Sequence, residues 1–308
     1  MTVFHPDLRA GRCIPKFSYG PRLARFMATR APKPKDPGEG VTAEELVVRG
    51  PQGGPDVVLR VFRPDGLTVA APALFWVHGG GLIGGSPQQD DATNIAFARE
   101  LGITVAAVAY RFAPTHPAPA AVEDVFAGYL GLLEHAERLH IDTARVAIGG
   151  ASAGGGLAAA LALLIYDRGA PAPAFQLLVY PMLDDRTAAR TDMDTRNVRV
   201  WTPGSNRFAW ESYLGAEPGG SDVSPYAAPA RRVAVSGLPP AWIGVGTLDL
   251  FYEEDIEYAR RLNESGVACE VYVVPGAFHG FDAIFRKADV TQEFWAEQAR
   301  ALRAVLFD

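Results

Sequence analysis

Short apolar runs alternate with longer stretches of helical periodicity along most of the chain. The apolar runs predict buried strands at residues 57–62, 74–77, 105–110, 146–149, 175–180, 241–246 and 270–274. Apolar residues at helical spacing predict helices at residues 120–139, 155–167, 254–264 and 292–306. This alternation predicts an α/β fold class, with a mostly parallel central sheet covered by helices on both faces.

Two parts of the chain depart from the alternation. Residues 1–45 combine a predicted helix at 21–29 with a proline-rich stretch at 31–38, which cannot form a regular helix or a central strand. Residues 186–232 have the composition of an insertion between strands. Aromatic residues in this insertion can line a pocket or pack it onto the body, and packing is favoured because large aromatic side chains dominate core energetics. They are Trp201, Phe208, Trp210, Tyr213 and Tyr226.

Composition narrows the class of protein. The chain has 308 residues, of which 48% are hydrophobic, enough for a large core. A net charge of −6 argues against nucleic acid and anionic membrane surfaces as partners. The two cysteines, Cys13 and Cys269, form neither a disulfide framework nor a metal site. Because no signal peptide and no bilayer-spanning run is recognisable, we expect a cytoplasmic protein without a membrane span.

Ser152 is the strongest candidate for chemistry. It lies between a predicted strand and a predicted helix, bracketed by Gly150 and Gly154. A sharp turn with small flanking residues lifts a serine hydroxyl clear of the backbone, as a nucleophile requires. Taken alone, the same pattern also suits a loop whose serine caps the following helix.

A glycine triplet upstream strengthens the catalytic hypothesis. Gly79, Gly80 and Gly81 follow His78 directly after the strand predicted at 74–77. Their backbone N–H groups, together with that of Ala153, can stabilise the oxyanion of a tetrahedral acyl intermediate. A flexible turn is the alternative for the triplet, and His78 is interpreted as a structural residue of this loop.

A serine nucleophile needs a base and an acid that orients the base. His279 follows the strand predicted at 270–274, and Asp249 follows the strand predicted at 241–246. Both loops are expected at the carboxyl end of the sheet. Glu254 is the second candidate for the acid, although carboxylates there also favour the positive end of a helix dipole. The order Ser152, Asp249, His279 differs from the orders of chymotrypsin and subtilisin.

From about residue 57 to the C-terminus, these motifs resemble the hormone-sensitive-lipase-like family of α/β-hydrolase esterases, bacterial esterase family IV. The segments that match are 78–81, 110–114 with Pro117, Pro119, Ala120 and Asp124, then 150–154, 181–184, Asp249 with Glu254, and 279–281. The resemblance implies an α/β-hydrolase catalytic domain at 46–308, a cap segment at 1–45 and a cap insertion at about 186–232. It also implies a catalytic triad of Ser152, Asp249 and His279, and an oxyanion hole built from Gly79, Gly80, Gly81 and Ala153.

Two positions depart from the family pattern. Ala151 stands before the serine where Asp, Glu or Thr is common, and Thr115 stands where a glutamate is common. Ala151 removes any side-chain hydrogen bond made from that position, and Thr115 removes a charge from a loop interpreted as structural. Neither change touches the proposed triad.

The function that the resemblance implies is hydrolysis of short- to medium-chain acyl esters by a serine carboxylesterase without a cofactor or metal. An amidase or peptidase with the same triad is the alternative enzyme. A small-molecule receptor is a further alternative, disfavoured because such receptors lack the histidine that His279 supplies. The expected partner is a small-molecule ester substrate, and the resemblance also suggests a homodimer through the last strand, at 270–274.

Overall fold

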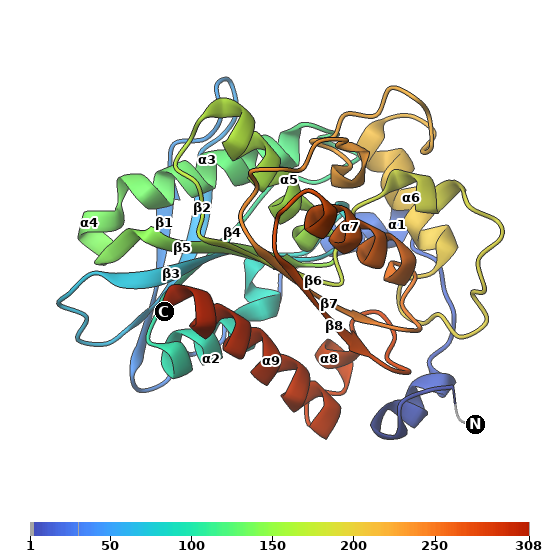
Figure 1. Cartoon of the computed structure of the whole chain (residues 1–308), viewed down its shortest axis with the longest axis horizontal. Coiled ribbons are helices and arrows are strands. Elements are labelled where there is room, and N and C mark those ends of the chain that lie inside the picture. The colour runs from blue at the N-terminus through green and yellow to red at the C-terminus, as the bar shows by residue number, and fades with distance from the viewer. Residues whose placement is uncertain (1–2, 30, 308) are drawn as a thin grey trace.

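The computed structural model describes residues 3–29 and 31–307. They form one eight-stranded sheet with helices around it (Figure 1). The strand order is β1-β2-β4-β3-β5-β6-β7-β8. β2 runs antiparallel to β1 and β4, and every other neighbouring pair is parallel. The strands are β1 Val41–Val48, β2 Val57–Pro64, β3 Ala71–Val77, β4 Thr104–Val108, β5 Ile141–Ala151, β6 Phe175–Val179, β7 Ala241–Gly246 and β8 Cys269–Val274.

All seven predicted strands are present, and β1 is an eighth that the hydrophobic pattern did not predict. β1 carries the adjacent acids Glu44 and Glu45, and its burial alternates imperfectly because it pairs on one side only, at the edge of the sheet. It begins at Val41, so the sheet starts inside the range 1–45 that the sequence assigns to the cap.

Helices cover both faces of the sheet, as predicted. α3 (Ala120–Glu134), α5 (Ala153–Arg168) and α7 (Tyr252–Glu264) pack on one face, and α2 (Asp91–Leu101) and α9 (Asp289–Leu306) pack on the other. In Figure 1 α3 and α5 lie above the sheet, and α2 and α9 lie below it. The helix predicted at 120–139 is divided at His135 into α3 and α4 (Ala136–Leu139), and α2 was not predicted.

The two hydrophobic clusters explain why the central strands are continuous apolar runs. Along β3, Phe75 and Val77 enter the cluster beneath α3 and α5, whereas Leu74 and Trp76 enter the cluster beneath α2 and α9. A parallel strand buried on both faces has no polar side. The alternation of β3 side chains between the two faces of the sheet therefore cannot be seen in hydrophobicity alone.

The remaining elements gather near the carboxyl ends of the strands. The N-terminal part forms η1 (Pro6–Cys13) and α1 (Pro21–Ala28), and β6 and β7 are separated by η3 (Asp185–Ala189), α6 (Pro203–Leu214) and η4 (Pro229–Arg231). α8 (Phe281–Ile284) precedes α9. α1 and α6 lie at the same end of the molecule (Figure 1). No described helix combines the length and the apolar character needed to cross a bilayer.

Candidate active site

Ser152 occupies a strained turn between β5 and α5. Its backbone has φ 58° and ψ −121°, a conformation that side-chain-bearing residues rarely adopt. A Cβ at Gly154 would lie 2.1 Å from the carbonyl oxygen of Val77, and a Cβ at Gly150 would lie 2.4 Å from that of Gly154. The glycines that bracket the serine are therefore required by the closeness of the turn to β3 and to itself.

The structure brings Ser152, His279 and Asp249 into one hydrogen-bonded chain. His279 Nε2 lies 2.9 Å from Ser152 Oγ, and His279 Nδ1 lies 2.8 Å from Asp249 Oδ2. Asp249 Oδ1 accepts a further hydrogen bond from the Phe251 N–H at 3.0 Å. The three side chains follow β5, β8 and β7, which lie close together in the sheet order, and all three residues are buried.

Glu254, the second candidate for the acid, lies elsewhere. Its Oε1 accepts from the backbone N–H groups of Leu183, at 2.7 Å, and Asp184, at 3.2 Å, and its Oε2 accepts from the Thr187 hydroxyl. Burial raises the pKa of this carboxyl well above its ordinary value. Glu254 therefore anchors the segment that follows β6, and Asp249 is the carboxylate that contacts His279.

The glycine loop lies directly beside the serine. A Cβ at Gly79 would lie 3.5 Å from Ser152 Cβ, and Gly80 and Gly81 have φ of 129° and 64°. The N–H groups of these three glycines donate to no backbone carbonyl within the described ranges 3–29 and 31–307. Ala153 is the first residue of α5, where an N–H group has no partner within the helix. Gly79 thus lies beside Ser152, with Gly80 and Gly81 next along the same loop and Ala153 next to the serine in the chain.

His78 supports the glycine loop from beneath. Its Nδ1 lies 2.7 Å from the Gly79 carbonyl oxygen, and its ring stacks on Tyr110 with centroids 4.3 Å apart. The Tyr110 hydroxyl donates to the His78 carbonyl oxygen at 2.9 Å. Burial lowers the pKa of His78 to about 4, so the imidazole is neutral at pH 7. These contacts support the structural interpretation of His78.

Aromatic side chains that the sequence did not single out as a group surround the His279 ring. Ring centroids lie 4.8 Å away for Tyr180, 5.1 Å for Phe251 and 6.3 Å for Trp201. Tyr180 directly follows β6 and Phe251 follows the Asp249 turn, so their positions next to strand ends were the available signal. Trp201 comes from the insertion, where no periodicity placed it.

A cavity of about 290 Å³ lies behind the serine turn and is lined by Ala151, Tyr180, Asp90 and Asp282, among others. Burial raises the pKa of Asp90 to about 7 and raises that of Asp282. The small Ala151 side chain leaves this space open, and it makes no hydrogen bond from the position where the family commonly has a polar residue.

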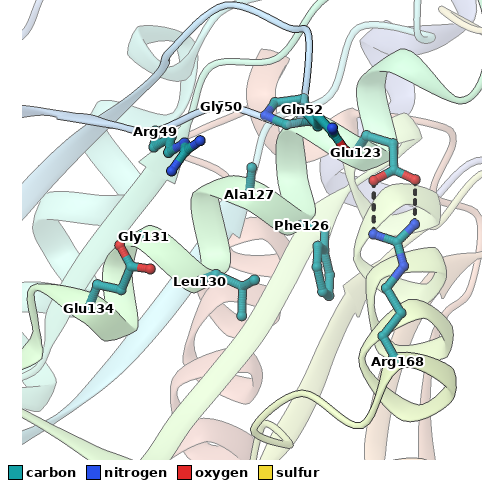
Figure 2. Close-up of a pocket in the computed structure, with 11 residues that line it drawn as sticks. Arg49, Gly50, Gln52, Glu123, Phe126, Ala127, Leu130, Gly131, Glu134 and Arg168 are labelled. Carbon is teal, nitrogen blue, oxygen red and sulfur yellow. Dashed lines mark hydrogen bonds and ion pairs between the residues drawn. The ribbon is translucent and has the colours of Figure 1, made fainter.

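Figure 2 shows a separate pocket of about 400 Å³ between the turn at 49–52 and α3. Phe126 and Leu130 lie along it, and the ion pair of Glu123 with Arg168 lies at one end. Neither Ser152 nor His279 lines it. The serine site is therefore distinct from this pocket.

Comparison with known proteins agrees with the fold. A family model described as an alpha/beta hydrolase fold matches residues 74–283. The carboxylic ester hydrolase LipN of Mycobacterium tuberculosis is 34% identical over 271 residues, which are 86% of this chain and 71% of the relative. The ethyl acetate hydrolase of Pseudomonas putida is 32% identical over 242 residues, 77% of this chain and 76% of the relative.

Among solved structures, a bacterial heroin esterase superposes with a TM-score of 0.89 at 35% identity, covering 99% of both chains. The predicted α/β-hydrolase fold is thereby confirmed, together with the resemblance on which that prediction rested. The chain belongs to the hormone-sensitive-lipase-like esterases of the α/β-hydrolase superfamily.

Proposed function

We propose that the protein hydrolyses short- to medium-chain acyl esters through a covalent acyl-enzyme on Ser152. By its family membership the protein is a carboxylic ester hydrolase. The observation that carries the finer proposal is the chain of hydrogen bonds from Ser152 Oγ through His279 to Asp249, with distances of 2.9 and 2.8 Å. This is the arrangement in which a base, held by an acid, activates a hydroxyl nucleophile.

In the first half-reaction, Ser152 Oγ attacks the ester carbonyl carbon while His279 Nε2 takes the hydroxyl proton. Asp249 holds the imidazole with its Nδ1–H toward the carboxylate and stabilises the imidazolium that forms. The carbonyl oxygen becomes an oxyanion, which the N–H groups of the glycine loop and Ala153 stabilise. His279 then protonates the alkoxide as the C–O bond breaks, and the alcohol leaves an acyl-serine behind.

In the second half-reaction, water takes the place of the alcohol. His279 Nε2 removes a proton from the water as its oxygen attacks the acyl carbon, and the same N–H groups stabilise the second oxyanion. The proton returns to Ser152 Oγ when the ester bond to the serine breaks, which releases the carboxylic acid. Each half-reaction transfers one acyl group and returns one proton, so the serine ends unchanged.

The proposed cap over the site is consistent with a small substrate. We assign the cap to the N-terminal segment within residues 1–45 and to the insertion at about 186–232. The Trp201 ring of the insertion lies 6.3 Å from that of His279, and Tyr19 of the N-terminal segment packs on Trp201. A cavity of about 730 Å³ lies between α1 and the 110–116 loop, with Ile83 and Phe112 in its lining. Ser152 and His279 do not line it, but Ile83 follows the glycine loop by two residues, so we assign to this cavity only a part of the substrate that extends beyond that loop. One relative is named for its action on ethyl acetate, a small ester.

The test is hydrolysis of p-nitrophenyl esters from acetate to palmitate by the unaltered protein and by the Ser152→Ala variant. Turnover that peaks at short chains and falls by about four orders of magnitude or more in the variant supports the proposal. Activity that survives the substitution contradicts the role of Ser152. An acyl p-nitroanilide cleaved faster than the matching ester would assign the site to amides instead.

Ligand binding without turnover of any ester would favour a receptor. The hydrogen bond between His279 and Ser152 argues against that function, because a receptor has no use for a base aligned on the hydroxyl. Tight binding of a small molecule by the Ser152→Ala variant, combined with inactivity of the unaltered protein on every ester, is the result that would revive it.

We also propose that the protein pairs through β8 to form a homodimer. β8 is the last strand of the sheet and pairs only with β7 among the described strands, and residues 269–273 are partly accessible. An unpaired edge can add a strand from a second copy. Light scattering during gel filtration should give about twice the chain mass of 33.0 kDa. The mass of a single chain at micromolar concentration would contradict the proposal.

A further inference from the structure

Trp201 occupies the space where Gly81 would carry a side chain. A Cβ at Gly81 would lie 2.2 Å from Cη2, 2.9 Å from Cζ3 and 3.0 Å from Cζ2 of the indole. The benzene edge of the indole therefore rests on the backbone of the glycine loop. Gly81 is required both by its φ of 64° and by this contact.

The same indole reaches the other side of the site. Its ring lies 6.3 Å from that of His279, measured between centroids, with 41° between the planes. Trp201 is only 4% exposed, and we call the surface that its ring forms between Gly81 and His279 the wall. The wall extends from the loop proposed to bind the oxyanion to the base proposed to protonate the leaving group.

The indole is held in one orientation. Its Nε1–H donates to Asn206 Oδ1 at 3.1 Å, and Asn206 is fully buried in α6. The ring of Tyr19 packs against it with centroids 5.4 Å apart. A hydrogen-bonded and packed indole cannot turn aside to admit a larger group without breaking these contacts.

Tyr19 is itself fastened to the insertion. Its N–H donates to Ser205 Oγ at 3.0 Å, Ser18 Oγ lies 3.0 Å from Thr202 Oγ1, and that Thr202 hydroxyl lies 3.2 Å from the Phe17 carbonyl oxygen. We call this set of contacts between residues 17–19 and 202–205 the cap clasp. The clasp holds the N-terminal segment and the insertion together around Trp201.

We infer that Trp201 sets the upper limit on the acyl chain that the site accepts. The inference rests on the proposed function. In the tetrahedral intermediate Ser152 Oγ, the oxyanion toward the glycine loop and the leaving oxygen toward His279 Nε2 take three of the four directions on the carbonyl carbon, so the acyl chain takes the fourth, toward the side that the indole closes. The indole closes the space between Gly81 and His279, and an acyl chain that extends beyond a few carbons meets the ring.

The experiment compares kcat/KM for p-nitrophenyl acetate, butyrate and octanoate in the unaltered protein and in the Trp201→Ala and Trp201→Phe variants. Removing the indole opens space for several methylene groups, so the octanoate-to-acetate ratio should rise at least about tenfold in Trp201→Ala. The smaller Phe ring should give an intermediate rise. Because Trp201→Phe keeps an aromatic ring in the wall, it tests the inference even if Trp201→Ala does not fold.

Trp210→Phe is the matched control. Trp210 is fully buried in α6, the helix that begins two residues after Trp201, and packs against Tyr213 with centroids 6.2 Å apart, so its replacement loosens the insertion without altering the wall. This variant should keep the octanoate-to-acetate ratio of the unaltered protein. An equal rise in Trp210→Phe would show that general loosening of the cap is responsible and would overturn the inference.

Two further results separate the possible failures. If both Trp201 variants turn over acetate with an unchanged ratio, Trp201 does not limit the acyl chain, and the proposed function still stands. A gain confined to esters of larger alcohols, measured with ethyl and octyl acetate, also overturns the inference. If the folded, unaltered protein cleaves no ester of the series, it is the proposed function that fails.

Discussion

Tyr180 links His279 to a buried carboxylate: its ring meets the imidazole at a centroid distance of 4.8 Å, and its hydroxyl donates to Asp282 Oδ1 at 2.8 Å. The Trp295 indole N–H donates to the other oxygen of Asp282 at 3.1 Å. Burial of Asp282 raises its pKa, and the hydrogen bonds from Tyr180 and Trp295 oppose that rise. His279 thus packs against Tyr180, and the Tyr180 hydroxyl is held in turn by Asp282.

Replacing Tyr180 by Phe should lower kcat a few-fold and leave KM unchanged. The ring that contacts the imidazole remains, but its hydroxyl no longer fixes it to Asp282, and the free energy of unfolding should fall by about 1–3 kcal/mol. Steady-state kinetics and urea unfolding measure both effects. Tyr129→Phe is the control and should leave kcat unchanged, because it removes a partly buried hydrogen bond of 2.9 Å to the Pro171 carbonyl oxygen far from the proposed site. A hundredfold loss of kcat in Tyr180→Phe would contradict a merely supporting role.

Replacing Asp249 by Asn should lower kcat by about 10⁴-fold, because an amide no longer holds the imidazole in the productive tautomer. The paired variant Glu254→Gln should retain kcat within about tenfold and instead lower the free energy of unfolding, since Glu254 binds Leu183 N–H and Thr187. Kinetics and thermal unfolding of both variants distinguish the two carboxylates. The opposite pattern would transfer the catalytic role to Glu254.

Replacing Gly154 by Ala should destabilise the fold by at least about 3 kcal/mol, at the upper end of what overpacking usually costs. The added methyl would lie 2.1 Å from the Val77 carbonyl oxygen and 2.5 Å from that of His78, and backbone cannot move aside as a side chain can. Chemical unfolding measures the loss. At Gly220 the nearest atom to an added Cβ is 4.0 Å away, so Gly220→Ala should be close to neutral. Equal stability of the two variants would refute this account of the serine turn.

Asp90 should make the protein less stable as the pH rises from about 4 to 7. Burial raises the pKa of Asp90 from 3.8 to about 7, so between these values the folded protein holds a proton that the unfolded chain releases. The folded state therefore loses stability with rising pH, by at most about 1.4 kcal/mol per pH unit. Asp90→Asn removes this dependence. The free energy of unfolding of the variant, minus that of the unaltered protein, should therefore be larger at pH 8 than at pH 5, as measured by urea unfolding.

The control for Asp90 is an exposed carboxylate. The hydrogen bonds from Arg196 lower the pKa of Asp194 to about 2, so Asp194 is ionised in the folded and unfolded states throughout the range from pH 5 to pH 8. Asp194→Asn should therefore change stability by the same amount at both pH values. An Asp90→Asn variant that behaves in the same way would show that Asp90 is not protonated in the folded protein.

Much of the site was predictable because its parts lie at the ends of strands. The runs before Ser152 and Asp249 are apolar, the strand before His279 is mostly apolar, and the parallel sheet brings the carboxyl ends of all three to one edge. Asp249 was preferred over Glu254 because it follows a predicted strand, whereas Glu254 lies at the start of the next helix, and Asp249 is the carboxylate that contacts His279. The need for glycine at positions 150 and 154 was predictable from the sharp turn at Ser152. In the structure, close backbone contacts leave no space for a side chain at either position.

What the sequence could not predict depends on contacts between distant segments. β1 has the charged edge of a strand that pairs on one side only, and Trp201 lies in an insertion with no periodicity. Its neighbours Gly81, Tyr19 and His279 are at least 78 residues away along the chain. Packing was the favoured interpretation for the aromatic residues of the insertion, and Trp210 and Tyr213 are indeed fully buried. Trp201 packs as well, but against the glycine loop and His279.

The cap clasp has a consequence for building chimeras from related esterases. Ser18 and Thr202 are 184 residues apart, yet they meet at 3.0 Å beside the ring that faces His279. A graft that exchanges only the insertion would replace residues 202–205 but keep residues 17–19, and so would break the contacts of the cap clasp. Transplanting substrate preference between family members should therefore require both segments to be moved together, so that the N-terminal residues are inherited as part of the pocket.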